Sequence, residues 1–520
     1  MSKRLAPTLL AGTLAVIYLI VSPPSLDLAA HLARAQLFST EGFGLWDNWW
    51  YAGHHVLGYS VLFPPLAAPL GPQLVGALAA VATAATFEPL ARERFGPDAW
   101  LGSLWFGAAT AIDLYTGRLT FAFGLLPAVG CALALQRRRD ALAGLLAVLT
   151  ALASPVAALF SALAAVACAV ARRSERGGSI RAMLAPLAVA ALSLGPVGVL
   201  AVLFPEGGSE PFTLATLWPI PAVCLVALIA LPRRDVALRA GLVLYILGCL
   251  ASFEVATPVG SNAARLGPLL AGPLAALLWW PRRRTLLALA VLPLAYLQWQ
   301  APIRDLTTSL GDASTNSSYY QPLLAFLDRQ RGVPFRVEIP FTHFHWEAYE
   351  VAPRFPLARG WERQLDIKYN QLFYGGKLDA ATYHAWLRQL SVRFVAVSSG
   401  PADYSAHAEI ALIARGLPYL RLVMHTVDWS VYEVRDPLPM ASGVATVTAL
   451  GANSVTLRAA RPGTTLVRVR FTPYWALSGS PGCIAPDGEF TQVTLRRPGP
   501  AKMVIRFALD RVGSRSARCD

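Results

Sequence analysis

The sequence predicts a polytopic membrane protein: a mainly α-helical bundle of about eleven spans, followed by an α/β region and a β-sandwich outside the membrane. The 520 residues are 55% hydrophobic and only 15% charged, with a mean hydropathy of +0.46. This composition is more apolar than that of soluble domains. Apolar runs long enough to cross a bilayer recur up to about residue 300 and then stop. Beyond that point, shorter amphipathic patterns replace them.

The apolar runs divide the first 300 residues into eleven expected spans. They cover residues 5–22, 60–86, 99–115, 119–135, 141–153, 156–171, 183–204, 213–231, 236–252, 266–280 and 285–300. The first is expected to remain as an uncleaved helix, because its apolar run is long and ten more spans follow. The fifth and sixth are short and meet at Ser154-Pro155. They are either two short crossings or a broken, re-entrant pair, and two crossings preserve the alternation of loop charges.

Basic residues indicate the orientation of these spans. Of the 20 Lys and Arg residues before position 300, 17 lie in alternate loops, in clusters at 3–4, 92–94, 137–139, 172–181, 233–239 and 282–284. Because cytoplasmic loops carry an excess of Lys and Arg, the N-terminus is expected in the cytoplasm and everything after Ala301 outside. The net charge of +14 is then mostly an orientation signal and does not indicate nucleic acid as a partner. The Ala-, Leu- and Arg-rich composition suggests a bacterial plasma membrane.

Two soluble regions are expected after the helical domain of residues 1–300. Residues 301–437 alternate helical stretches such as QPLLAFLDRQ with strand-like ones such as VRFVAVSS, which predicts an α/β unit. Residues 438–520 contain short alternating runs such as SVTLRAA and TLVRVRFT, which are typical of a β-sandwich. Cys483 and Cys519 lie in this last region. They either pair in an oxidising compartment or remain free.

The first outer segment, between the first two spans, carries the most unusual polar residues. Asp27, His31 and Arg34 fall at i, i+4 and i+7, so they share one face of a helix. Asp27 directly follows Pro23-Pro24-Ser25 and either caps that helix or acts as a general base towards an acceptor hydroxyl. The segment continues as GLWDNWWYAGHH, whose aromatic residues either anchor it at the membrane surface or contribute to a site.

Three arginines lie at outer ends of spans, where the orientation rule does not place them: Arg34, Arg118 and Arg265. Arg118 follows Asp113 by one tight turn. The two either form a local ion pair or leave Arg118 to hold a phosphate bidentately. Arg265, next to Asn262, either joins the same anion site or reaches lipid headgroups.

Several histidines raise the possibility of a metal. His54 and His55 are adjacent, and His343, His345 and Glu347 alternate in THFHWE. Their spacing matches no closed metal site, so we expect solvated or packed histidines here.

These segments resemble the GT-C superfamily of integral membrane glycosyltransferases. The resemblance is carried by Asp27, the HLARAQLF helix, GLWDNWWYAGHH and the LFPPL entry to the second span. The chain looks most similar to bacterial membrane proteins named as related to 6-pyruvoyl-tetrahydropterin synthase, also through DLYTGR, GSNAARLG and RGWERQLDIKYNQLFYGG. The resemblance implies a lipid-phosphate-linked sugar donor and Asp27 as catalytic base, with Asp47 as a second first-loop acid. The chain lacks a clear paired-acid DxD or DE motif, which argues against metal dependence. A divalent cation stays a possible cofactor without a clear site.

The expected function is transfer of a sugar from a polyprenyl-phosphate donor to a glycan or lipid acceptor at the outer face of the plasma membrane. Asp27 would act as base, while Arg118 and Arg265 neutralise the lipid phosphate. The residues expected to bind substrate are His31, Arg34, Asp47, His54, His55, Asp113, Arg118, Asn262 and Arg265, with Arg359, Trp361 and Tyr374 in the outer domain.

Two other functions fit the same sequence. A transporter or flippase for a lipid-linked sugar would use the anion-binding arginines without needing a base, but such proteins usually contain repeated halves, and the sequence shows no repeat. A non-catalytic scaffold for envelope polysaccharide assembly would need neither base nor anion site.

Overall fold

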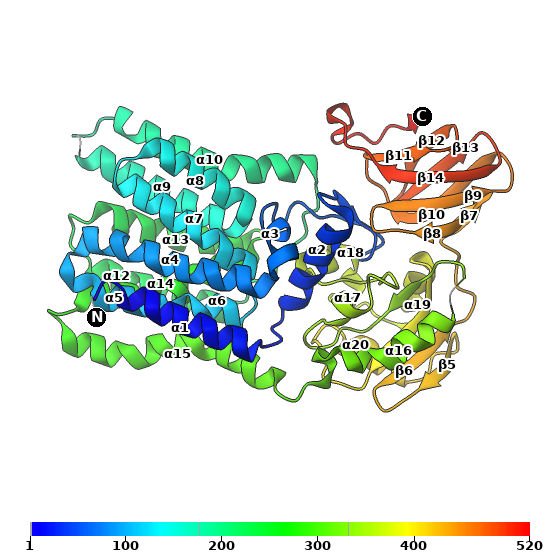
Figure 1. Ribbon diagram of the computed structural model, residues 1–520, viewed down its shortest axis with the longest axis horizontal. Coiled ribbons are helices and arrows are strands. Elements are labelled where there is room, and N and C mark those ends of the chain that lie inside the picture. The colour runs from blue at the N-terminus through cyan, green and yellow to red at the C-terminus, as the bar shows by residue number, and fades with distance from the viewer. Residues whose placement is uncertain (1–2, 176, 331, 520) are drawn as a thin grey trace. The chain divides into compact units, whose positions relative to one another are not determined.

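The computed structural model describes residues 3–175, 177–330 and 332–519, and the chain forms two compact units (Figure 1). The first comprises Met1–His31, Gly58–Ala201 and Gly207–Thr308, and the second Leu32–Leu57, Val202–Glu206 and Ser309–Asp520. Most of the first outer segment, expected to belong to the helical domain, therefore packs within the second unit.

The first unit is helical. Its helices are α1 (Ala6–Val21), α3 (Phe63–Leu70), α4 (Pro72–Phe95), α5 (Trp100–Ala109), α6 (Ala111–Tyr115), α7 (Leu119–Gln136), α8 (Asp140–Ala153), α9 (Pro155–Glu175), α10 (Arg181–Leu203), α11 (Leu214–Leu217), α12 (Pro219–Ala230), α13 (Val236–Glu254), α14 (Leu266–Trp279) and α15 (Arg284–Ser309), with the 3-10 turns η1 (Pro97–Ala99) and η2 (Gly260–Arg265). Helix α2 (Leu28–Glu41) begins in this unit and continues into the second.

Six helices in the described part of the chain are long and apolar enough to cross a membrane: α4, α7, α9, α10, α13 and α15. Helices α1 and α8 and the stretch Leu214–Ala230 are apolar but shorter. Helix length therefore does not support the expected count of about eleven spans. Two kinds of departure account for the difference. The run 99–115 is divided between α5 and α6, and the run 213–231 is divided between α11 and α12. Helices α1, α8 and α14 have only 16, 14 and 14 residues.

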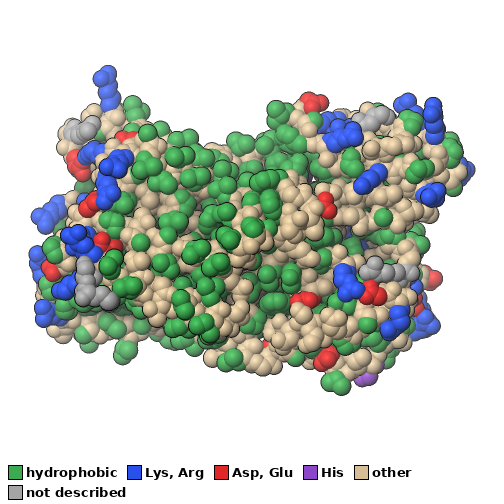
Figure 2. Space-filling view, in the orientation of Figure 1, with side chains coloured by type: hydrophobic (Ala, Val, Ile, Leu, Met, Phe, Trp, Pro, Cys, Tyr) green, Lys and Arg blue, Asp and Glu red, His purple; other side chains and the backbone are tan. Residues whose placement is uncertain are grey.

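The basic loops of this unit are tied together by ion pairs. These join the end of α4 to the loops before α8 and α13, and the loop before α8 to the end of α9: Arg94–Asp235 at 2.7 Å, Arg137–Glu93 at 2.5 Å and Arg138–Glu175 at 2.6 Å. Figure 2 shows Lys and Arg side chains gathered at one end of the helical unit, beside a broad apolar face.

The second unit contains a mixed four-stranded sheet of order β3-β4-β6-β5. The strands are β3 (Arg336–Glu338), β4 (Val392–Ser398), β5 (Leu420–His425) and β6 (Trp429–Val434), and the helices are α16 (Ser317–Arg329), α17 (Glu347–Glu350), α18 (Arg363–Tyr369), α19 (Ala380–Gln389) and α20 (His407–Ala414), with the 3-10 turns η3 (Ala313–Thr315) and η4 (Gln371–Phe373). Tyr383 and Leu387 of α19 share a buried core with Val395 of β4 and Ile413 of α20. Amphipathic helices thus cover the sheet.

The C-terminal region is β-rich, as predicted. It has a five-stranded sheet of order β15-β12-β13-β10-β7 and a four-stranded sheet of order β11-β14-β9-β8. Their strands are β7 (Ala441–Gly443), β8 (Ala445–Leu450), β9 (Ser454–Ala459), β10 (Gly463–Arg470), β11 (Trp475–Ser478), β12 (Gly482–Asp487), β13 (Phe490–Leu495), β14 (Gly499–Ile505) and β15 (Arg518–Cys519). Val455 and Leu457 of one sheet share a core with Val467 and Val493 of the other. Alternation of apolar side chains along each strand produces this sandwich.

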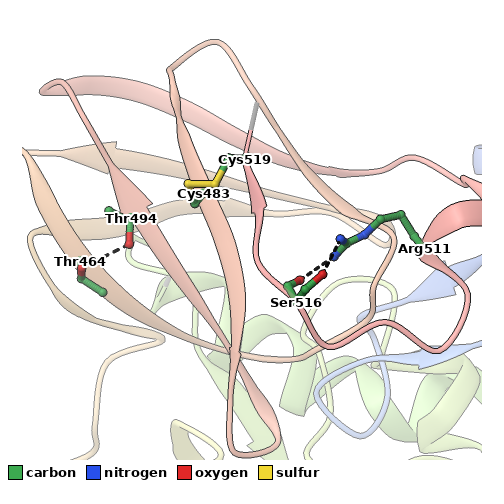
Figure 3. Close-up of a disulfide and its surroundings, with 6 residues drawn as sticks. All are labelled: Thr464, Cys483, Thr494, Arg511, Ser516 and Cys519. Carbon is green, nitrogen blue, oxygen red and sulfur yellow. Dashed lines mark hydrogen bonds between the residues drawn. A yellow bond between two sulfur atoms is a disulfide. The ribbon is translucent and has the colours of Figure 1, made fainter.

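A disulfide joins Cys483 of β12 to Cys519 of β15 (Figure 3). The sequence left open whether these two cysteines pair or remain free, and in the structure they are paired. The hairpin formed by β1 (Trp46–Asp47) and β2 (His54–His55) belongs to the same unit, and Trp46 is part of the sandwich core.

Candidate functional site

The turn between α6 and α7 organises a polar site in the first unit. Gly117 adopts φ +74°, and the backbone N–H of Arg118 donates to the Asp113 carbonyl at 2.8 Å. A Cβ on Gly117 would clash with the Ser25 side chain and lie 3.2 Å from the Asp27 nitrogen. The turn therefore packs directly against the segment that carries Asp27.

His31 fixes the same contact from the first turn of α2. Its Nε2 lies 2.9 Å from the Gly117 carbonyl, and its ring packs near Tyr59 and Phe63 at centroid distances of 5.9 and 5.3 Å. The side chain is buried. His31 thus holds Asp27 and the turn together, which is a positioning role.

Asp27 itself has a free carboxylate. Within the described chain its side chain makes no hydrogen bond or ion pair, and it accepts none from the backbone of α2. The capping role that the sequence left open is therefore not seen, and the partly exposed carboxylate is available for another partner.

Two guanidinium groups lie near this carboxylate. Arg265 ends η2 and lies over the Phe121 ring at 5.4 Å, in the first turn of the helix that Arg118 precedes. Burial lowers the pKa of Arg265, and the positive charge of Arg118 lowers it further, whereas Asp27 and Asp113 act in the opposite direction. The two arginines are therefore close enough to repel each other.

Neither arginine has a counter-ion at contact distance among the described residues. The Nε of Arg265 is buried without a hydrogen-bond partner, and the Arg118 side chain makes no hydrogen bond or ion pair. The expected local pair between Asp113 and Arg118 does not form through the side chains, although both arginines act electrostatically on the buried Asp113. Guanidinium groups in this state are suited to binding an anion from outside the chain.

Asn262 lies in η2, next to Arg265. Its side chain is partly exposed and makes no hydrogen bond to a described residue. The loop is fixed by neighbouring contacts, since Ser261 donates to Glu210 at 3.3 Å and a Cβ on Gly260 would clash with the Glu210 carbonyl. Asn262 therefore presents a free amide at a fixed position.

Asp305 and Tyr59 also belong to this group, and no sequence pattern singled them out. Asp305 is buried in α15 and acts electrostatically on Asp27 and Arg118. The expected last span stopped at residue 300, which left Asp305 outside the predicted helical domain. The helical spacing of the last span continues beyond residue 300, and this continuation is the signal that could have identified Asp305.

The other predicted residues of the first outer segment lie in the second unit. Arg34 pairs with Glu362, and both side chains are nearly buried. Asp47 accepts the Trp49 N–H at 2.8 Å, and burial raises the pKa of its carboxyl to about 6 although His54 lowers it. The three charged residues expected to share one helix face are thus divided between the units, and Arg34 forms its ion pair within the second unit.

The two adjacent histidines are packed. His54 stacks on Trp50 at a centroid distance of 5.7 Å. His55 lies 2.8 Å from Glu206 through Nδ1 and 3.0 Å from the Thr472 hydroxyl through Nε2. These contacts connect β2 to the sandwich.

Arg359 lies inside the second unit. It is 1% exposed, donates to Asp366 at 2.6 Å and to Glu409 at 3.3 Å, and lies over the rings of Phe341 and Phe373. Its guanidinium is fully used by these contacts, so it cannot touch an acceptor directly.

Trp361 and Tyr374 are partly exposed. Trp361 stacks on His345 at 3.4 Å, and the Tyr374 hydroxyl donates to Asp366 at 2.5 Å. His345 is fully buried, 3.7 Å from Glu347. No group of three or more metal-binding side chains occurs in the described ranges.

Neither a family model nor a curated protein matches this sequence. The chemistry of the site in the first unit therefore carries the functional argument.

Proposed function

We propose that this protein is an integral membrane glycosyltransferase that moves a sugar from a polyprenyl-phosphate donor to a glycan or lipid acceptor at the outer face of a bacterial plasma membrane. The acceptor hydroxyl oxygen attacks the anomeric carbon, and the bond between that carbon and the phosphate oxygen breaks. Asp27 takes the hydroxyl proton, and the electron pair leaves with the phosphate. The displacement inverts the anomeric centre.

The observation that carries this proposal is that the Asp27 carboxylate, which forms no ion pair, lies near two arginines that also lack counter-ions among the described residues. Asp27 lies beside the turn that precedes Arg118, and Arg265 lies over Phe121 in the first turn of α7. A lipid phosphate would complete the hydrogen bonding of both guanidinium groups. Asn262, with its free amide, is suited to holding a sugar hydroxyl.

The distribution of charge and the disulfide support the orientation. The loops joined by ion pairs hold most of the basic residues, as expected for a cytoplasmic face. The Cys483–Cys519 disulfide suits an oxidising compartment outside the cell. We retain the crossing of the shorter helices, giving about eleven spans, as part of this proposal. Trp361 and Tyr374 are then candidates for contact with the acceptor.

Replacing Asp27 by Asn tests the proposal. Loss of a general base lowers rates by roughly 10²- to 10⁴-fold, so purified Asp27→Asn should lose sugar transfer to that extent while still binding a polyprenyl phosphate. Asp98→Asn, an exposed acid in η1, is the control and should keep full activity. Sugar transfer by Asp27→Asn at the normal rate would contradict the mechanism. Movement of lipid-linked sugar across vesicles that survives the change would favour a transporter.

A further inference from the structure

We propose that the C-terminal sandwich binds an anionic glycan at one of its ends, through four arginines and a groove beside them. The glycan is the acceptor, so the inference rests on the proposed function and names the chemical class of its acceptor. We call this part of the sandwich the arginine-rich end. It is formed by the turns at residues 443–444, 460–462, 479–481 and 496–498.

The sandwich carries an excess of positive charge that membrane orientation does not explain. Residues 438–520 contain 11 Lys and Arg against 4 Asp and Glu, whereas residues 301–437 contain 14 of each. The orientation rule concerns short loops, and long domains cross the membrane largely regardless of their charge. Charge on such a domain instead decides what it attracts. The excess therefore indicates a negatively charged partner.

Strand pairing brings four of these arginines to the same end. The turns 460–462 and 496–498 are neighbours, because the strand ends on either side of them are paired: Ala459 with Gly499, and Gly463 with Leu495. The arginines on and beside these turns are Arg458, Arg461, Arg496 and Arg497. The fold thus gathers charges that lie up to 39 residues apart in the sequence.

Both turns hold their arginines on a rigid backbone. Each contains Arg-Pro-Gly, at residues 461–463 and 497–499. Proline fixes φ at about −65°, and the glycines that follow have φ +143° and +119°, which favours glycine. The Ala460 N–H also donates to the Val444 carbonyl at 2.9 Å. Rigid presentation lowers the entropy cost of binding.

The four guanidinium groups are available to a ligand. All four side chains are exposed, and none makes a hydrogen bond or ion pair with a described residue. The described acids of the sandwich lie towards its other end, where β12 ends and after β14: Asp487, Glu489 and Asp510. Arginine in this state binds carboxylate and phosphate groups bidentately.

A groove and a hydroxyl-rich sheet face adjoin the arginines. The groove has a volume of about 330 Å³, and its walls include Gly443, Arg458 and Gly499. A Cβ on Gly499 would meet no atom within 4 Å. In the sheet, Thr446 lies opposite Arg458, and on the outer face of the other sheet the hydroxyls of Thr464 and Thr494 are 3.3 Å apart (Figure 3). Hydroxyls beside cations suit a sugar that carries acid groups.

This surface is better suited to a glycan than to anionic lipid. No large hydrophobic side chain between residues 428 and 506, all of which are described, is exposed. Binding in a membrane interface requires buried apolar area as well as charge. The occupant is therefore a soluble or polymeric acidic sugar.

Binding is measured with the full-length protein in phosphatidylcholine nanodiscs. The probes are a uronic-acid oligosaccharide, its neutral carboxyl-reduced form and an oligosaccharide phosphate. The wild type should bind at least one acidic probe and not the neutral form. Arg461→Gln combined with Arg497→Gln should weaken that binding by about five- to twentyfold. Replacing both by Lys, which keeps the charge but loses bidentate bonding, should weaken it less.

The matched control combines Arg415→Gln with Arg506→Gln. It removes the same charge from two exposed arginines outside the arginine-rich end, and it should bind as the wild type does. Equal weakening by the control pair, binding of the neutral form, or failure to bind either acidic probe would overturn the inference. Capture of phosphatidylglycerol vesicles in place of the acidic probes would overturn it in favour of a membrane surface.

Sugar-transfer assays separate this inference from the proposed function. With an acidic acceptor, the Arg461→Gln and Arg497→Gln pair should raise KM and leave kcat unchanged, while KM for a neutral acceptor stays constant. Transfer to neutral acceptors alone would overturn the inference. A wild type that binds the acidic probe but transfers no sugar from any polyprenyl-phosphate donor would refute the proposed function, although the binding site would stand.

Discussion

Gly117 shows how one backbone position brings the site residues together. Its φ of +74° suits a glycine, and a side chain there would meet Ser25. Gly117→Ala should therefore destabilise the protein by about 2 kcal/mol or more, through backbone strain and the clash. It should also lower sugar transfer, because Asp27 is displaced.

The control for Gly117 is Gly177, which has a similar φ of +61° but no atom within 4 Å of the place that a Cβ would take. Gly177→Ala should cost only the backbone strain, about 1 kcal/mol. Thermal unfolding followed by intrinsic fluorescence would compare the two variants. Equal losses of stability would show that the contact with Ser25 has no role.

Individual residues differ in how well the sequence predicts them. Arg118 and Arg265 could be identified because they break the charge rule for membrane loops, and the structure leaves both without counter-ions among the described residues. Arg359 could not be distinguished from a surface arginine, because its partners Asp366 and Glu409 lie far apart in the sequence. A sequence pattern indicates where polar residues occur, but only the folded structure shows which of them are already paired.

Between elements, strand β3 and helix α20 are joined by two buried acids. Glu338 of β3 and Glu409 of α20 are both fully buried near Arg359. Burial raises the pKa of Glu409 to about 7, although the charge of Arg359 lowers it, and burial together with Glu409 raises that of Glu338 well above the ordinary value. The pair therefore holds a proton that the unfolded chain releases near pH 4.5.

This proton predicts a pH dependence of stability. The folded state binds more protons than the unfolded state between about pH 4.5 and 7, so stability should fall as the pH rises through this window. A shift of this size corresponds to a loss on the order of 3 kcal/mol. Unfolding midpoints between pH 5 and 7.5 should decline less in Glu409→Gln than in the wild type. The exposed Asp510→Asn should keep the wild-type slope, and an unchanged slope in Glu409→Gln would contradict the prediction.

Helix ends were the least predictable elements. The last span was expected to end at residue 300, yet α15 continues to Ser309, and Pro302, Asp305 and Ser309 are buried. Conversely, the run 60–86 reads as one span, but Gly71 ends α3 before α4 begins. Hydropathy averages over such breaks, whereas backbone conformation decides them.

For the whole molecule, the proposed orientation places Ser179 and Val427 on opposite sides of the membrane. Both are exposed, Ser179 between α9 and α10 and Val427 between β5 and β6. In intact cells, a membrane-impermeant maleimide should label Val427→Cys, and it should label Ser179→Cys only after permeabilisation. Labelling of the two in the reverse order would overturn the topology, and the unmodified protein controls for its native free cysteines.

For the whole molecule, the sequence predicted the order of the helical and β-rich regions better than it predicted which residues belong to each unit. A helix-rich first part and a β-rich last part follow from hydropathy and strand periodicity, and the structure contains both. The placement of residues 32–57 in the second unit could not be predicted, because it depends on contacts such as Asn48 N–H to the Ala452 carbonyl at 2.7 Å. Such long-range pairs leave no local pattern.

The early entry of residues 32–57 into the second unit has a consequence for synthesis on the ribosome. Trp46 packs against Trp475 at a centroid distance of 5.9 Å. The two are separated by about 430 residues, which take on the order of 20 to 90 s to translate at roughly 5–20 residues per second. During that time the tryptophans of the first loop have emerged but lack their final partners. The membrane surface or a chaperone has to shield them until the last sheet is made.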